Sequence, residues 1–134
     1  MKAGFVIDSS ALLAWLFGES GKKEVSSALA KGCLINTVNW SEILQKSAQK
    51  GIPSSMVYEE LHQKEILGTA LNLVDFTESL ASASAGLFDA TKPHGLSLGD
   101  RACLALGQER NIPVLTADKD WKKVDLSIEV LLIR

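Results

Sequence analysis

Short apolar runs rich in β-branched residues alternate with helical patterns along the whole sequence, and this alternation constrains the fold more than any other feature. Because parallel strands need crossover connections, the alternation predicts an α/β fold, with a mostly parallel sheet covered by helices on both faces. We therefore expect a three-layer α/β/α sandwich with roughly five strands. The expected strands are residues 5–7, 33–35, 70–74, 113–116 and 128–133, and the expected helices are 11–17, 22–31, 38–50, 54–67, 77–89 and 97–110, with a helical turn at 118–122.

Acidic residues recur where these strands end or these helices begin. In a parallel sheet with right-handed crossovers, helix starts and strand carboxyl ends share one edge, which is where open α/β sheets place their sites. Asp8 directly follows the first strand, and the next residue pair, Ser9 and Ser10, is expected to include the serine cap of the first helix. The other acids expected at this edge are Glu42, Asp100, Asp118 and Asp120.

Four carboxylates in one pocket would raise each other's pKa unless cations offset their charge. No His or Cys is adjacent in sequence to any of these acids. Sites made only of oxygen ligands favour Mg²⁺ or Mn²⁺ over zinc. The pattern therefore predicts a divalent metal centre built around Asp8, with Glu42, Asp100 and Asp118 as its other acids.

Each acid also has a structural interpretation. Asp8 could form an Asx turn at a strand end. Glu42 could be a solvated helix residue paired with Lys46, four positions on. Asp100 has the spacing of a capping box with Ser97. Asp118 could cap the helical turn after it, and Asp120 is expected to be secondary or solvated.

The overall charge excludes little. The 14 basic and 16 acidic side chains of the 134 residues give a net charge of −2, which argues weakly against a nucleic-acid partner. If four acids are metal ligands, however, 14 basic residues face 12 remaining acids, a balance of +2. The hydrophobic share of 46% is enough for one compact domain spanning residues 1–134.

Nothing in the sequence predicts secretion or membrane insertion. The first apolar run is too short for a signal peptide, and no run approaches the about 20 residues of a spanning helix. Cys33 and Cys103 lie in apolar segments without metal-ligand spacing. We expect both to be small core residues in a reducing, cytoplasmic environment.

Four stretches that carry the acids resemble the acidic motifs of the PIN-domain nucleases, and of these most closely the VapC-type toxins of bacterial toxin–antitoxin pairs. The resemblance covers essentially the whole chain in length, motif order and spacing. The second and fourth stretches are the most specific. The four are Val6-Ile7-Asp8-Ser9-Ser10, Val38-Asn39-Trp40-Ser41-Glu42, Ser97-Leu98-Gly99-Asp100 and Leu115-Thr116-Ala117-Asp118-Lys119-Asp120-Trp121.

The resemblance implies a PIN-like sandwich and a metal-dependent endoribonuclease that uses Mg²⁺ or Mn²⁺. It assigns Asp8, Glu42, Asp100 and Asp118 as catalytic, metal-binding acids, all of which are present. Ser9 and Thr116 are implied as supporting hydroxyls. The family also implies a homodimer, a small antitoxin partner, and an RNA substrate such as a tRNA or a ribosomal RNA loop.

Several cations near the acidic motifs are candidates for RNA contacts. Lys119, Lys122 and Lys123 follow or belong to the fourth motif, and Arg101 adjoins the third. Lys92 and His94 precede the third motif, with His94 expected to be a loop residue rather than a general base. Ordinary solvated charge remains the alternative for each.

Two apolar features are candidate partner surfaces. The first helix carries apolar residues on nearly every face, so other helices cover it or part of it stays exposed, with Trp15 the candidate for exposure. The small-residue segment 79–85 is a second candidate contact, with a dimer as the candidate assembly.

Two other functions compete with the nuclease. A non-catalytic PIN-fold binding module that sequesters RNA or a protein would explain the missing basic excess, but not the complete set of acids. A phosphatase of the haloacid dehalogenase type would need an Asp-x-Asp motif after the first strand. Ser10 stands at that second position, which disfavours the phosphatase.

Overall fold

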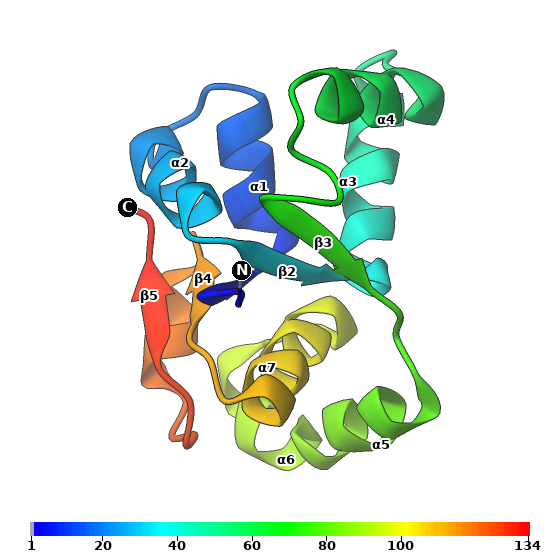
Figure 1. The fold of residues 1–134 in the computed structure, drawn as a ribbon. Helices are drawn as coiled ribbons and strands as arrows, with labels where there is room; N and C mark the ends of the chain where they lie inside the picture. The colour runs from blue at the N-terminus through cyan, green and yellow to red at the C-terminus, as the bar shows by residue number, and fades with distance from the viewer. Residues whose placement is uncertain (1) are drawn as a thin grey trace.

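A five-stranded, all-parallel sheet forms the centre of the protein (Figure 1). The structure is a computed structural model, and it describes residues 2–134. Every neighbouring strand pair is parallel, in the spatial order β3-β2-β1-β4-β5. The predicted α/β sandwich is therefore confirmed. The strands are β1 (Phe5–Ile7), β2 (Cys33–Asn36), β3 (Leu71–Val74), β4 (Val114–Thr116) and β5 (Val130–Leu132).

Helices cover both faces of this sheet (Figure 1). In the view of Figure 1, α1 and α2 lie above the sheet, α5, α6 and α7 lie below it, and α3 and α4 stand at one side. The helices are α1 (Ser9–Leu16), α2 (Lys22–Ala30), α3 (Thr37–Gln49), α4 (Ser54–Gln63), α5 (Glu78–Gly86), α6 (Phe88–Thr91) and α7 (Leu98–Arg110), with 3₁₀ turns η1 (Lys92–His94) and η2 (Lys119–Lys123).

Alternate strand residues supply two hydrophobic cores, one on each face of the sheet. On β1, Val6 joins the core beneath α7, whereas Ile7 joins the core beneath α1, α2 and α3. This period of two follows from the pleat of a strand. Cys33 and Cys103 are buried, free thiols, one in each core, as expected for small core residues.

The middle of helix α7 is buried on every side, as its apolar segment 102–106 predicts. Six consecutive residues of it, 102–107, are buried. Gly107 allows the strand to approach, because a Cβ atom there would lie 2.5 Å from Val114 Cγ1. Helix α7 is consequently packed closely against the sheet near β4.

Three predicted boundaries differ from the structure. The cap of α1 is Asp8 rather than a serine, and Ser9 and Ser10 form the first turn. Helix α4 ends at Gln63 instead of residue 67, because Glu65 turns the chain with φ 57°. The predicted helix 77–89 is two helices, α5 and α6, which are separated at Leu87.

The strand order places the sequence-predicted acids. Strand β1 continues outward to β2 and β3 on one side and to β4 and β5 on the other, so the order reverses between β1 and β4. Ligand sites of open α/β sheets lie at such a reversal, outside the strand carboxyl ends. Asp8 follows β1 there, and Thr116 ends β4. Across residues 2–134 no helix is both long and apolar enough to cross a membrane.

Candidate functional site

Asp8 is the buried centre of a hydroxyl-rich cluster. Its side chain is 3% exposed, although it is a carboxylate. Ser10 Oγ donates to its two oxygens at 2.8 and 2.9 Å, and Thr116 Oγ1 donates to Oδ2 at 2.6 Å. The backbone N–H of Ala11 donates to Oδ1 at 2.9 Å, so Asp8 also caps α1. The cap and the proposed metal role are therefore compatible.

Burial raises the pKa of Asp8 from 3.8 to about 6. Hydrogen bonds from Thr116, Ala11 and Ser10 act in the opposite direction, and the negative charge of Asp100 raises the pKa further. A buried carboxyl with so many donors still keeps its proton more tightly than usual, because no positive charge compensates it. The site thus disfavours the ionised form of Asp8 unless a cation joins it.

Glu42 is held by polar groups rather than by the lysine that sequence spacing offers. Ser9 Oγ donates to Glu42 Oε1 at 3.1 Å, and Asn39 Nδ2 donates to the same atom at 2.8 Å. The ion pairs of residues 2–134 are Lys64–Glu60 and Lys123–Asp120, so the alternative pairing with Lys46 is absent there. Glu42 therefore points toward the first turn of α1, beside Asp8.

The lack of a side chain at Gly99 makes room for the Glu42 carboxylate. A Cβ atom at Gly99 would lie 2.8 Å from both Glu42 oxygens, a separation that real Cβ atoms do not tolerate. Asn39 Nδ2 also donates to the Gly99 carbonyl oxygen at 3.0 Å, which ties α3 to the start of α7. A glycine one residue before Asp100 consequently lets two of the acidic motifs meet.

Asp100 and Asp118 each use part of a carboxylate to cap the backbone. The predicted capping box of α7 is present, with the Ser97 N–H donating to Asp100 Oδ2 at 2.9 Å and the Asp100 N–H donating to Ser97 Oγ at 3.3 Å. The Asp120 N–H donates to Asp118 Oδ1 at 2.9 Å, which makes Asp118 the cap of η2. The pKa of Asp100 is raised by burial and, further, by the charges of Asp118 and Glu42.

Within residues 2–134, three carboxylate oxygens of this site accept no protein hydrogen bond: Glu42 Oε2, Asp100 Oδ1 and Asp118 Oδ2. No lysine, arginine or histidine of this part of the chain pairs with any of the four acids. The charge of Asp100 raises the pKa of Asp8, and the charges of Asp118 and Glu42 raise the pKa of Asp100, so Asp100 connects the four acids electrostatically. The edge is thus a concentration of uncompensated negative charge.

The donor chemistry fits a hydrated Mg²⁺ or Mn²⁺ ion. No three His, Cys, Asp or Glu side chains of residues 2–134 are arranged as a ready-made metal site. Mg²⁺ does not need one, since it keeps several waters and is commonly bound through one or two carboxylates. Such an ion would bind the free oxygens of Glu42, Asp100 and Asp118, and its positive charge would lower the raised pKa of Asp8.

Sequence reasoning missed two side chains of the site. Ser10, considered only as a possible helix cap and as an argument against a phosphatase, bonds Asp8 and accepts from the Ala117 N–H at 3.0 Å, thereby joining the start of α1 to the end of β4. Asn39 joins Glu42, Gly99 and Asn36, whose Nδ2 donates to Asn39 Oδ1 at 2.8 Å. Asn39 faces Glu42 because it lies three residues earlier on α3, a spacing that was readable.

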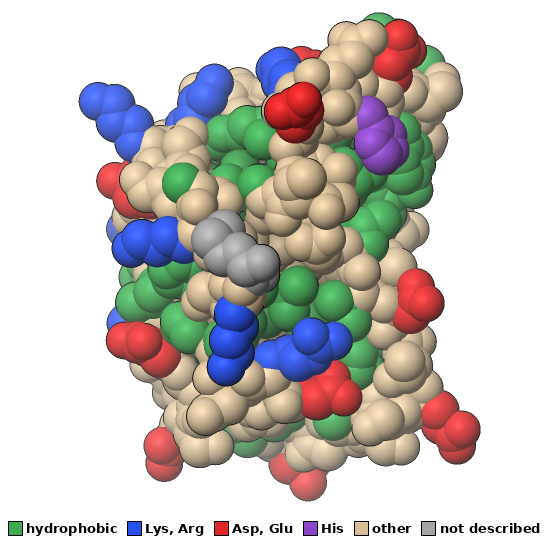
Figure 2. All heavy atoms as spheres, in the orientation of Figure 1, with side chains coloured by type: hydrophobic (Ala, Val, Ile, Leu, Met, Phe, Trp, Pro, Cys, Tyr) green, Lys and Arg blue, Asp and Glu red, His purple; other side chains and the backbone are tan. Residues whose placement is uncertain are grey.

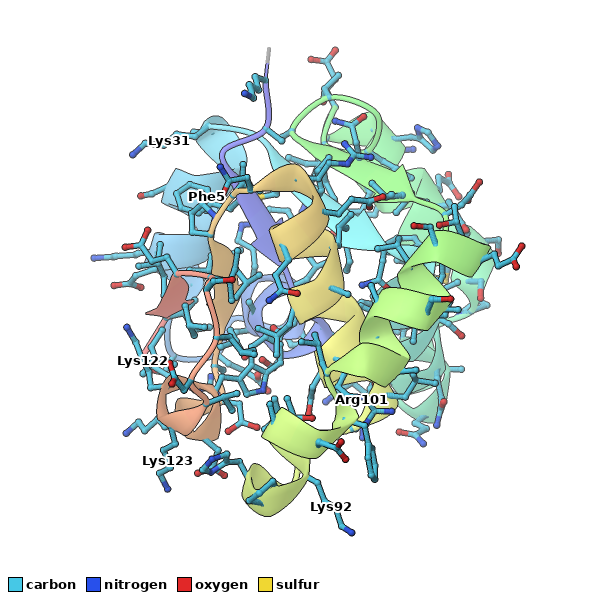
Figure 3. All side chains as sticks on the ribbon, turned by 90° about the horizontal axis from the view of Figure 1, so that it is seen from below. Phe5, Lys31, Lys92, Arg101, Lys122 and Lys123 are labelled. Atoms are coloured by element: carbon cyan, nitrogen blue, oxygen red, sulfur yellow. The ribbon has the colours of Figure 1, made fainter. Side chains whose placement is uncertain are left out.

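The predicted basic contacts lie at the same end of the molecule but have different environments. Figure 3 shows Lys92, Arg101, Lys122 and Lys123 toward one end of the molecule. Lys31 and Phe5, the first residue of β1, lie toward the opposite end. Lys123 pairs with Asp120 at 2.9 Å, so Asp120 is engaged away from the four acids.

Arg101 is the exception among these cations, because backbone groups engage it. Its Nε atom donates to the Ser84 carbonyl oxygen at 3.1 Å, and its guanidinium lies 5.3 Å from the centre of the Phe88 ring. His94 lies half-buried in η1. RNA contact by Arg101, Lys119, Lys122 and Lys123 stays a prediction.

The candidate partner surfaces are partly occupied by the protein itself. Trp15 is half-buried, as expected, and its Nε1 donates to Ser26 Oγ at 3.0 Å. The other apolar residues of α1 are buried or half-buried. Helix α5 packs on α7 through Leu80 and Ser84, and its remaining small residues face solvent.

Comparison with known proteins supplies the family. The PIN domain family model matches residues 5–126. A search of curated proteins gives no match. Solved structures with the same fold include a toxin–antitoxin complex from Klebsiella pneumoniae, with 18% identity, a TM-score of 0.70, and coverage of 96% of this chain and 97% of that one.

Two further solved structures are similar over most of both chains. The DNA-bound VapBC from Salmonella typhimurium has 12% identity, a TM-score of 0.73, and coverage of 99% of this chain and 100% of that one. VapC20 from Mycobacterium tuberculosis, described as a toxin that cleaves the sarcin-ricin loop, has 13% identity, a TM-score of 0.71 and coverage of 89% and 93%. With the family model spanning nearly the whole chain, this protein belongs to the PIN domain family.

Proposed function

We propose that this protein is a Mg²⁺- or Mn²⁺-dependent endoribonuclease that acts as the toxin of a toxin–antitoxin pair. One observation carries the catalytic part of the proposal. Glu42, Asp100 and Asp118, which lie at the same sheet edge as the buried Asp8, each keep a free carboxylate oxygen, and no cationic side chain of residues 2–134 compensates them. PIN domains are generally nucleases, and the fold of this chain is shared with VapC structures.

The four acids divide the work of hydrolysing a phosphodiester bond. When bound, the divalent ion lowers the pKa of its water and neutralises negative charge on the phosphoryl oxygens. Asp8 and Asp100, the two acids with raised pKa, would hold the ion directly or through water. Glu42 and Asp118 orient the attacking water with their free oxygens, or help to hold a second ion. The products are a 5′-phosphate and a 3′-hydroxyl.

Hydroxyl groups keep the acids in position during this reaction. Ser10, in the first turn of α1, and Thr116, at the end of β4, donate hydrogen bonds to the oxygens of Asp8. Ser9 donates one to Glu42. Such preorganisation matters because a small misplacement of a catalytic group lowers the rate substantially. Ser9 and Thr116 are therefore positioning residues, and Ser10 joins them.

The toxin role rests on the solved structures of the same fold. Those from Klebsiella pneumoniae and Salmonella typhimurium are a toxin–antitoxin complex and a DNA-bound VapBC. VapC20 cleaves a ribosomal RNA loop, according to its description. By this likeness we propose a small antitoxin partner, a homodimer, and a tRNA or ribosomal RNA target.

The function is tested by incubating the purified protein with total RNA plus Mg²⁺ or Mn²⁺ and mapping the new 5′ ends. We expect cuts at defined sites that disappear with EDTA and in the Asp8→Asn protein. Full cleavage by Asp8→Asn would refute the assignment of Asp8. Specific RNA binding by the wild-type protein without any cleavage would instead support a binding module.

A further inference from the structure

A pocket of about 480 Å³ opens between α1 and α3, and its lining includes Ser10, the residue that bonds Asp8. One wall is a single face of α1, formed by Ser10, Leu13 and Phe17 at positions i, i+3 and i+7. The opposite wall comes from the second half of α3, and the side chain of Arg134 also lines the pocket. Its volume lies within the usual range of small-molecule and nucleotide sites.

The pocket combines positive charge with one aromatic ring. Lys46, Lys50 and Arg134 line it against the single acid Glu19, a local balance of +2. Among residues 2–134, none of these three cations forms an ion pair. The Lys50 ammonium lies 4.8 Å from the centre of the Phe17 ring. Proteins bind single-stranded nucleic acids through positive charges that contact the phosphates and aromatic rings that stack on the bases.

Two features make this pocket continuous with the acids. Ser10 lines the pocket, and the same hydroxyl donates to Asp8 at 2.8 Å. Glu42 and Lys46 on α3 and Lys50, which caps its end, follow one another at intervals of four residues and thus lie along one face. Ser10 and this helix face therefore connect the pocket to the carboxylates.

We propose that this pocket binds the nucleotide next to the scissile phosphate of a single-stranded RNA, an inference that rests on the nuclease function proposed above. Lys46 and Lys50 contact the neighbouring phosphate, and Phe17 receives the base or ribose. Cations near η2, on the β4 side of the acids, then grip the chain beyond the cut. An RNA crossing from one basic group to the other passes over Asp8.

A protein segment with acidic residues is the alternative occupant. It would satisfy the lysines, but it has no planar group to place against Phe17 at each residue. Nor does it explain why the basic pocket adjoins a site for a metal and a phosphodiester. The geometry therefore favours RNA.

The first test measures affinity without cleavage. A fluorescein-labelled single-stranded RNA of mixed sequence is titrated with the protein in EDTA, at several salt concentrations, by fluorescence anisotropy. For the double variant Lys46→Gln/Lys50→Gln we expect at least about tenfold weaker binding, and a salt slope smaller by about 0.7, from the loss of the one phosphate that both lysines neutralise.

The matched control is Lys2→Gln/Lys31→Gln, which removes the same charge from the opposite end of the sheet. Lys31 lies far from Lys122 and Lys123 in Figure 3, and neither control lysine lines the pocket. We expect its affinity to stay within about twofold of the wild-type value, with about the same salt slope. Equal losses in both double variants would overturn the pocket, because they would report only net charge.

The second test locates the base. RNA carrying 5-iodouridine is irradiated with the protein, and the cross-linked peptide is identified by mass spectrometry. We expect the adduct at Phe17, and at least about a threefold loss of affinity in Phe17→Leu that does not depend on salt, because stacking is uncharged. Cross-links confined to other segments would overturn the assignment.

These outcomes separate the pocket from the nuclease function. Cleavage by the wild-type protein together with unchanged RNA affinity in Lys46→Gln/Lys50→Gln refutes the pocket alone. Binding that depends on both lysines and on Phe17, without metal-dependent cleavage, refutes the nuclease function alone. If an acidic peptide binds through both lysines while RNA affinity is unaffected, the pocket belongs to a protein partner and the proposal is wrong.

Discussion

At the scale of single residues, Asp8 sets the balance between stability and function. Its pKa of about 6 in the folded protein exceeds its ordinary value of 3.8. The unfolded chain therefore loses this proton at a lower pH than the folded protein does. Without metal, stability from this group falls as pH rises from about 4 to about 6, and stays low above that.

Replacing Asp8 by Asn should remove this loss. A shift of about two pKa units corresponds to about 3 kcal/mol, part of which the variant forfeits through altered hydrogen bonds. At pH 7 in EDTA we expect Asp8→Asn to unfold at a higher urea concentration than the wild-type protein. Its free energy of unfolding should be larger by about 1–3 kcal/mol. The advantage should vanish below pH 4. Lower stability of the variant at pH 7 would contradict the buried, uncompensated charge.

Gly99 offers a second test, of geometry rather than charge. In Gly99→Ala the new Cβ would meet both Glu42 oxygens at 2.8 Å, so the carboxylate must move. Alanine is favoured over glycine in a helix by about 1 kcal/mol, so the fold should survive while RNA cleavage drops by about tenfold or more. Gly86→Ala on α5 is the control, because its Cβ meets nothing within 4 Å. Equal cleavage by both variants would exclude a role for this close approach.

Some residues of the site could be predicted from the sequence and others could not. The position of Asp8, Glu42, Asp100 and Asp118 at one sheet edge follows from strand–helix alternation, because topology alone fixes it. The roles of Ser10 and Asn39 in the site were not predicted, because their hydrogen-bond partners Ala117 and Gly99 are distant in sequence. Whether an exposed-looking polar residue meets such a partner depends on packing that no local pattern contains.

At the scale of elements, the start of α7 couples stability to the site. Ser97→Ala removes one half of the capping box, which typically costs about 1 kcal/mol. It also frees the Asp100 backbone from Ser97 Oγ, so we expect RNA cleavage to fall several-fold. Thr77→Ala, which removes the cap of α5, should cost a similar free energy of unfolding without changing cleavage. If both variants lose cleavage equally, stability rather than the position of Asp100 is responsible.

The elements themselves were largely predictable, and their ends were not. All five strands and the long helices α3 and α7 lie where periodicity places them. The end of α4 depends on Glu65 in a left-handed conformation, which glycine would have signalled and glutamate does not. The cap of α1 was assigned to a serine, yet Asp8, one residue earlier, takes that place and serves the site as well.

At the scale of the whole molecule, charge is organised locally. Figure 2 shows basic and acidic side chains interspersed over one face, consistent with the net charge of −2. Four acids gather at one sheet edge, with Lys46, Lys50 and Arg134 on one side and the η2 lysines on the other. A bulk charge near zero therefore hides the pattern that a polyanionic substrate would meet.

Mn²⁺ binding measured by electron paramagnetic resonance shows whether these carboxylates jointly bind a divalent ion. Asp100 is the suitable variant, because its charge acts on those of Asp8, Glu42 and Asp118. We predict Mn²⁺ binding by the wild-type protein that Mg²⁺ displaces, and at least about tenfold weaker binding by Asp100→Asn. Asp89→Asn, an exposed acid on α6, should bind as the wild-type protein does. Equal Mn²⁺ affinity in all three proteins would contradict the account.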